Sequence, residues 1–171
     1  ADGNPVREPG ACKYVKAIGW YVEEYGIAQV SANLTNIQET PVHLVFEESR
    51  KSANRRGLRV TGSELVGVIP LKAMLDAGKH YLRLQQRSTG IPDREIIKIA
   101  VKSMGLDELY PFKPEEKIIE DILAPERPLA SMTLQEFTDE TSRDSAAPGG
   151  GSVAAAAGAL AAGLAAMVAN L

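Results

Sequence analysis

Apolar and polar residues alternate with a period of two over residues 27–34. Such alternation is typical of a half-buried strand. Residues 13–22 are rich in aromatic and β-branched residues and predict a partner strand, with a turn at 23–26 between the two. The pattern therefore predicts a two-stranded antiparallel hairpin. Its second strand carries a polar strand face, which consists of Gln29, Ser31 and Asn33.

Helical spacing follows the hairpin. Thr40 and Pro41 predict a helix start, because threonine caps free backbone amides and proline suits the first helical position. This helix is expected to run to about Arg56 and to stop at Gly57, a residue that suits a left-handed cap. Residues 71–86 predict a second helix.

Two more elements complete the first region. Residues 58–60 and 65–69 predict a strand that is interrupted at 61–63. Asp93 is expected to cap a third helix that ends at Gly105, with an apolar face of Ile96, Ile97, Ala100, Val101 and Met104. The order is strand, strand, helix, strand, helix, helix. It predicts an α+β fold with an incomplete ferredoxin-like antiparallel sheet, because one upstream strand and helix would complete a β-α-β-β-α-β unit.

The C-terminal part predicts the start of an all-α domain. A short helix is expected at 115–123 between prolines, and Thr133 and Glu136 fit a capping box. The predicted organisation is a loop over 1–10, an α+β domain over 11–123, a linker over 124–131 and truncated helices of an all-α domain over 132–171.

The last 19 residues, 153–171, contain no charged residue. A membrane-spanning helix needs about 20 predominantly apolar residues. Ten of these residues are alanine, however, which has little hydrophobic drive. Leu160, Leu164, Met167 and Leu171 share one face at helical spacing. We therefore expect a helix that is buried in a soluble bundle, and no membrane partner.

Composition excludes several classes of function. A formal net charge of -3 provides no basic face for nucleic acid. Cys12 is the only cysteine, which excludes an internal disulfide and is typical of a reducing, cytoplasmic setting. His43 and His80 have no orienting acid or nucleophile nearby in the sequence, so each is expected to be a satisfied structural residue. No metal site and no catalytic residue is predicted.

The segment from 61 to 72 joins the predicted strand to a helix and forms the first candidate site. Gly62 lets the backbone approach a ligand closely. Ser63 and Glu64 can hydrogen-bond a pterin or a substrate amine, and Lys72 can meet a carboxylate. The structural alternative is a β-bulge at Gly62, a solvated glutamate and an ordinary surface lysine. Composition alone favours that alternative.

Two other segments are candidate binding sites. The polar strand face suits recognition of a neutral ligand if another layer covers it, and otherwise it faces water. The second is Gly150, Gly151 and Ser152, before a long helix. Ser152 can cap this helix, and open amides at its positive end favour an anion such as a carboxylate. A flexible hinge is an equally good interpretation of these residues.

Several long strings resemble a known family. The segments 18–21, 29–34, 61–70 and 104–107 are similar to the C-terminal subdomain of glutamate formiminotransferase. The segment 145–155 resembles the opening of formiminotetrahydrofolate cyclodeaminase. Their order is that of the bifunctional formiminotransferase-cyclodeaminase family.

The resemblance implies transfer of the formimino group of N-formimino-L-glutamate to the co-substrate tetrahydrofolate. The fused cyclodeaminase then releases ammonia to give 5,10-methenyltetrahydrofolate, in histidine degradation. It also implies a homo-oligomer, and a folate that lies between two subdomains. The catalytic histidine belongs to the N-terminal subdomain, so this chain alone is expected to be inactive. The polar strand face is then expected to be a wall of the folate cleft. The alternative is a non-catalytic ferredoxin-like assembly module.

Overall fold

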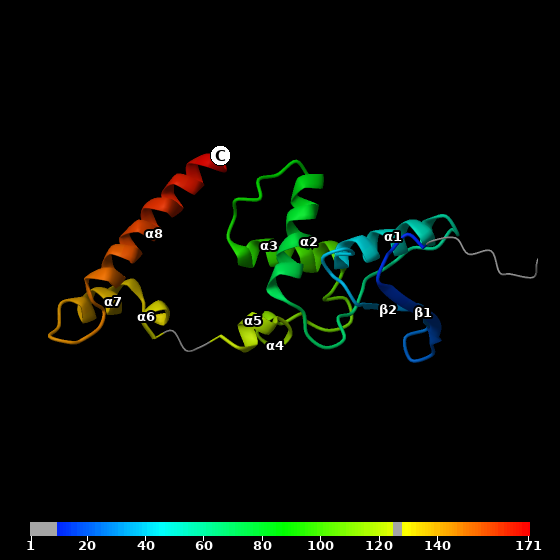
Figure 1. Ribbon diagram of the computed structural model, residues 1–171, viewed down its shortest axis with the longest axis horizontal. Coiled ribbons are helices and arrows are strands. Elements are labelled where there is room, and N and C mark those ends of the chain that lie inside the picture. Colours follow the sequence, from blue (N-terminus) through cyan, green and yellow to red (C-terminus); the bar gives the residue numbers. More distant parts are fainter. Residues whose placement is uncertain (1–9, 125–127) are drawn as a thin grey trace, which may run out of the picture. The chain divides into compact units, whose positions relative to one another are not determined.

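A computed structural model describes residues 10–124 and 128–171 (Figure 1). Backbone contacts divide the chain into two compact units. The first unit contains the residues up to Thr89 and Asp93–Ile122, and the second contains Gly90–Pro92 and Leu123–Leu171. Most of the predicted N-terminal loop and the linker residues 125–127 lie outside the described residues.

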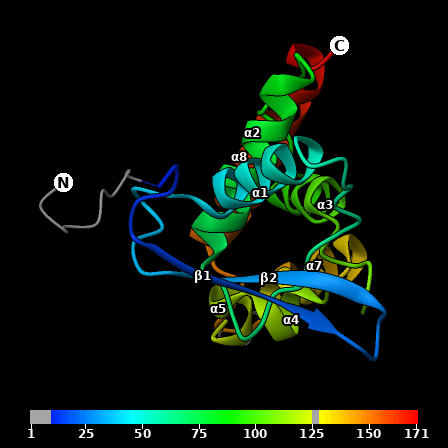
Figure 2. The same ribbon diagram turned by 90° about the vertical axis from the view of Figure 1, so that its right-hand side faces the viewer.

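The predicted hairpin is confirmed. β1 (Val15–Val22) pairs with β2 (Ile27–Leu34) in antiparallel orientation, side by side in Figure 2. The register joins Val22 to Ile27 across a turn in which Gly26 has a φ of 64°, a value that favours glycine. A two-stranded sheet with helices agrees with the predicted α+β class.

Three helices build the core of the first unit: α1 (Val42–Asn54), α2 (Leu71–Leu84) and α3 (Asp93–Met104). The predicted apolar face of α3 is buried in full against α2, where Met74 and Leu82 have no exposed surface. Gly57 and Gly105 follow α1 and α3 with φ values of 74° and 60°, as predicted for left-handed residues.

The predicted cap at Thr40 is wrong. Pro41 is the N-cap of α1, and its side chain makes no capping hydrogen bond. Thr40 is instead buried, and its hydroxyl donates to the Lys13 carbonyl at 2.6 Å. The residue therefore fastens the base of the hairpin to the start of α1.

The strand predicted over 58–60 and 65–69 is also wrong. Within the described part of the chain, Ile69 is the only one of these residues that makes a bridge, to Ile118, and Gly67 lies in a bend with a φ of 85°. Apolar residues favour an extended backbone, but a strand also needs a partner along its length. The helix predicted over 115–123 is interrupted at the buried Ile118, which separates α4 (Pro114–Lys117) from α5 (Ile119–Ile122).

The second unit is helical, with α6 (Pro128–Ser131), α7 (Leu134–Thr141) and α8 (Gly150–Ala169). The predicted capping box of α7 is confirmed, since Thr133 and Glu136 bond each other's backbone amides. The predicted cap at Ser152 is wrong, because α8 begins two residues earlier and Gly149 is its N-cap. No residue of α8 is buried against the described residues, so the predicted burial of this helix is not observed.

Candidate functional site

The polar strand face shares its side of the sheet with residues of β1. Residues directly opposite each other in an antiparallel pair point to the same face. The register places Trp20 opposite Gln29, Ile18 opposite Ser31 and Lys16 opposite Asn33. The face is therefore a mixed surface, in which an indole and an isoleucine lie beside an amide and a hydroxyl. Sequence analysis of β2 alone missed the residues that β1 contributes.

Both faces of the hairpin are open among the described residues. On the face with Gln29, Ile18 is 68% exposed and Trp20 is 45% exposed. On the opposite face, Tyr21 and Val30 are 62% and 63% exposed. A contiguous group of exposed aromatic and aliphatic side chains is typical of a binding or interaction surface.

Gly62 and Ser63, at the junction, are engaged in packing within the first unit. A Cβ added at Gly62 would lie 2.8 Å from the Glu108 Cβ and 2.9 Å from the Gly105 carbonyl oxygen. The Ser63 hydroxyl donates to the Met104 carbonyl at 2.7 Å, and its amide donates to the Gly105 carbonyl at 3.0 Å. The bare Cα and the serine fit the chain against the end of α3, so their contacts favour a packing role over ligand binding. The expected β-bulge at Gly62 is not observed, because residues 61–66 lie in no strand.

Glu64 lies beside a pair of hydrogen-bonded tyrosines. The Tyr25 and Tyr110 hydroxyls are 2.9 Å apart, which links the turn of the hairpin to the segment after α3. This hydrogen bond, with the charges of Glu24 and Glu64, raises the pKa of Tyr25 to about 12. Glu64 and Tyr110 also line a hollow of about 40 Å³. Ligand pockets measure roughly 300–1,000 Å³, so this hollow accommodates water but not a pterin.

Lys72 lies on the exposed side of α2, in its first turn. Its ammonium nitrogen is 2.6 Å from a carboxylate oxygen of Asp76, and the two side chains are 75% and 43% exposed. An exposed pair of this kind contributes little to stability. The lysine therefore remains accessible to an anionic ligand.

The glycine run lies at the N-terminus of α8. Gly150 and Gly151 are its first residues, and the Ser152 amide donates to the Gly149 carbonyl at 2.9 Å. A Cβ added at either glycine would meet nothing within 4 Å. The first amides of a helix lack helical partners and attract anions. The local geometry is therefore compatible with an anion at this end of α8.

Comparison with known proteins identifies the family. The family model for the formiminotransferase domain matches residues 1–124. The chain belongs to the formiminotransferase family. A second family model, formiminotransferase-cyclodeaminase, matches residues 133–171. The hairpin and the junction thus lie in the formiminotransferase match, and the glycine run lies in the cyclodeaminase match.

Some relatives of this formiminotransferase family member are named for two activities and others for one. The chain is 46% identical over 167 residues to a formimidoyltransferase-cyclodeaminase of Mus musculus and 44% identical over 169 residues to one of Gallus gallus. These matches cover 96% and 97% of this chain, but 31% of each relative. A glutamate formimidoyltransferase of Streptococcus pyogenes is 41% identical over 76 residues, which are 44% of this chain and 25% of that protein. The chain therefore spans about a third of the bifunctional relatives.

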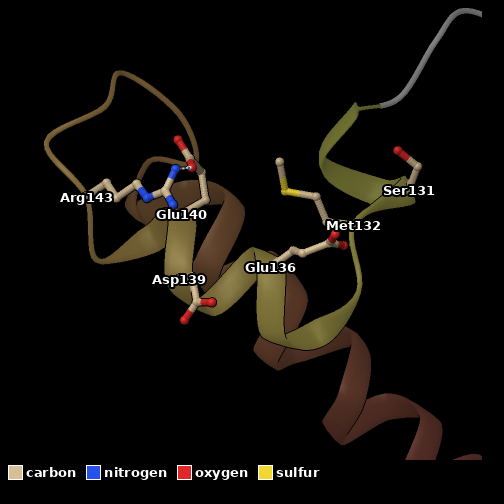
Figure 3. A pocket seen from close by; sticks show the side chains of 6 residues that line it. All are labelled: Ser131, Met132, Glu136, Asp139, Glu140 and Arg143. Carbon is tan, nitrogen blue, oxygen red and sulfur yellow. Dashed lines mark hydrogen bonds and ion pairs between the residues drawn. The ribbon is translucent and has the colours of Figure 1, made fainter.

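A larger hollow of about 420 Å³ lies beside α7, in the cyclodeaminase part (Figure 3). Figure 3 shows Arg143 turned toward Glu140, and their closest atoms are 3.1 Å apart. Glu136 is held by the capping box. The hollow is lined by Ser131, Met132, Glu136, Asp139, Glu140 and Arg143. None of the ten predicted site residues is among them. Three carboxylates against one guanidinium give a negative surface, which disfavours the carboxylates of a folate.

α8 is long and apolar enough to cross a membrane by length and composition, with a mean hydropathy of 1.9. Core helices of soluble proteins can have the same length and composition. Most of the family match to the cyclodeaminase lies on α7 and α8. Among residues 10–124 and 128–171, no group of three histidine, cysteine or acidic residues is arranged to hold a metal ion.

Proposed function

We propose that residues 11–123 form one wall of the tetrahydrofolate cleft of a formiminotransferase. The complete protein transfers the formimino group of N-formimino-L-glutamate to tetrahydrofolate. Its cyclodeaminase part, which begins at residue 132 in this proposal, releases ammonia and leaves 5,10-methenyltetrahydrofolate. The family matches over residues 1–124 and 133–171 support both halves of this proposal.

The mixed face of the hairpin is the observation that carries the proposal. A pterin is a flat aromatic ring with hydrogen-bonding edges, so it requires an apolar surface and a few polar groups. Trp20 supplies a flat ring, and the facing Gln29 supplies both a donor and an acceptor. Ser31 adds a hydroxyl on the same face, opposite Ile18. These side chains suit binding and orientation, since none of them is a general base.

The reacting groups are assigned to another part of the complete protein. In this proposal the catalytic histidine belongs to the N-terminal formiminotransferase subdomain, which faces this wall across the folate. The present chain alone then binds folate weakly and does not turn over. Gly150, Gly151 and Ser152 bind a carboxylate of the folate in the cyclodeaminase part. The complete protein is a cytoplasmic homo-oligomer.

A second candidate function is a non-catalytic assembly module. The large exposed apolar residues on both hairpin faces, among them Tyr21 and Val30, favour it. In this case the hairpin builds contacts with other parts of the protein or with another copy, and the polar strand face has no ligand.

The two proposed functions predict different effects on folinate binding when the Ser31 hydroxyl is removed. Ser31→Ala in the complete protein removes one hydrogen bond to folate, worth about 0.5–1.5 kcal/mol, and weakens folinate binding roughly 2- to 12-fold. Ser103→Ala makes the same chemical change on α3 and is the matched control. Isothermal titration with folinate, together with turnover of N-formimino-L-glutamate, measures both variants.

Unchanged affinity and turnover in Ser31→Ala contradict the folate wall and favour the assembly module. Glu64→Ala supplies an independent measurement on the other candidate segment, at the junction. If Glu64→Ala weakens folinate binding and Ser31→Ala does not, the folate contact lies at the junction and not on the strand face.

A further inference from the structure

α1 contacts α2 through polar as well as apolar side chains. No residue of α1 is buried in the described structure, and its apolar contacts with the core come from the partly buried Val42 and Phe46. The remaining contacts involve the imidazoles of His43 on α1 and His80 on α2, whose ring centroids are 4.3 Å apart at an interplanar angle of 23°. The two helices therefore meet through a stacked histidine pair.

The sequence predicted a satisfied structural histidine at each position, and His43 does not fit that prediction. Its Nδ1 atom is buried and has no hydrogen-bond partner among the described residues. His80 also packs against the ring of Tyr81, which is edge-on to the imidazole with the two ring centroids 5.1 Å apart. An added proton on Nδ1 of His43 would be a buried donor without an acceptor, so this position favours the neutral imidazole.

Charged groups from both helices face the pair. From α1, Glu47 accepts a hydrogen bond from Tyr81 at 3.2 Å and from Arg50 at 2.6 Å. From α2, Asp76 lies one turn before His80 and pairs with Lys72. The two carboxylates favour a protonated His43, whereas burial first, and then His80, act against it. Burial and His80 prevail, so the pKa of His43 lies below its ordinary value of 6.5.

We propose that the stacked His43 and His80 side chains form a proton-operated latch, which holds α1 on α2 while His43 is neutral and releases α1 when His43 takes up a proton. Stacked imidazoles attract each other as neutral rings and repel each other as cations at this separation. The proposal stands independently of the folate function.

Release of α1 would also loosen the hairpin. The Thr40 hydroxyl donates to the Lys13 carbonyl at 2.6 Å, and the Thr35 amide donates to the Tyr14 carbonyl at 2.9 Å. These bonds tie the base of the hairpin to the segment that leads into α1. The latch therefore couples the protonation of His43 to the attachment of the hairpin.

The sign of the pH effect follows from the direction of the shift. A histidine whose pKa is lower in the docked state binds its proton first in the released state. Docking is therefore strongest above about pH 6.5, the ordinary pKa of histidine. It weakens as the pH falls below that value, by up to about tenfold per pH unit for each linked proton.

The chain contains only two histidines, so one substitution assigns both imidazole signals in an NMR titration. His43 is expected to titrate below 6.5. Amide hydrogen exchange, corrected for intrinsic rates, is expected to show α1 losing protection relative to α3 over the same titration. A His43 pKa at or above 6.5, or a constant ratio of α1 to α3 protection, would overturn the proposal.

Two variants separate the latch from a merely structural contact. His80→Phe keeps a stacked ring but cannot take up a proton, so the pKa of His43 is expected to rise and the pH dependence of α1 protection to weaken, while the burial of His43 retains the rest of it. Tyr81→Phe is the matched control, since it removes the bond to Glu47 but leaves both imidazoles, and its pH dependence should persist. An unchanged pH profile in His80→Phe contradicts the latch. Should this variant fail to fold, the NMR titration and hydrogen exchange of the unmodified chain still test the proposal.

Discussion

Gly78→Ala tests whether the packing of α2 against α3 requires a residue without a side chain at position 78. Gly78 is buried in α2, and a Cβ built there would lie 2.2 Å from the Ile96 carbonyl oxygen and 2.5 Å from the Ile96 Cγ2. Ordinary contacts begin at 3.4 Å, so the two helices must separate by about 1.2 Å at this point. A side chain could rotate away, but the backbone carbonyl of α3 cannot.

Two opposing effects set the magnitude of this change. Alanine is favoured over glycine in a helix by about 1 kcal/mol. Overpacking typically costs about 1–3 kcal/mol, and this contact belongs at the upper end because α3 must move as a whole. Met74 has no exposed surface and belongs to the same core cluster as residues of α3, so it would lose contact there. We expect a net destabilisation of about 2 kcal/mol, or a fall of about 5–10 °C in Tm for a unit of this size.

Thermal unfolding followed by far-ultraviolet circular dichroism measures this effect. Gly163→Ala is the matched control, because the same substitution in α8 would place its Cβ where no atom lies within 4 Å. The control should leave the melting of the first unit unchanged and stabilise α8 by about 1 kcal/mol. An unchanged or higher Tm in Gly78→Ala would refute the close packing of α2 on α3.

Two hydrogen bonds provide further stability predictions. Glu120 caps α2 from a distant segment, since its carboxylate accepts the Leu71 amide at 2.6 Å, so Glu120→Ala should cost about 1 kcal/mol in urea unfolding. An unchanged stability in Glu120→Ala would argue against this cap. Thr40→Val keeps the shape of the side chain but removes its bond to Lys13, so it should cost about 1–2 kcal/mol by the same assay. A neutral effect would show that the Thr40 bond does not stabilise the chain.

The elements that could be predicted are those with strong local signals. Strict alternation and a turn of four residues specify β1 and β2, and glycines mark the ends of α1 and α3. The strand predicted over 65–69 failed because its pairing depends on residues far away in sequence, and only Ile69 finds one, in Ile118. The caps at Thr40 and Ser152 failed for a related reason, because tertiary contacts and the glycine run decide where each helix begins.

The candidate site shows the same division. The polar residues of β2 could be read directly, since alternation places them on one face. Trp20 required the register, which assigns it to Gln29 once the turn is known to span residues 23–26. Ser63 illustrates what sequence alone does not provide, because the partner of its hydroxyl, the Met104 carbonyl, lies 41 residues along the chain.

Hydrogen exchange of the hairpin in the complete protein tests the folate wall most directly. Mass spectrometry with and without folinate follows peptides that cover β1 and β2, and peptides from α3 serve as an internal reference. Bound folinate is expected to slow exchange of the peptides that contain Trp20 and Ser31, and to leave α3 unchanged. Folinate that is bound, as titration shows, but leaves the hairpin peptides at their original exchange rates would contradict the proposed wall.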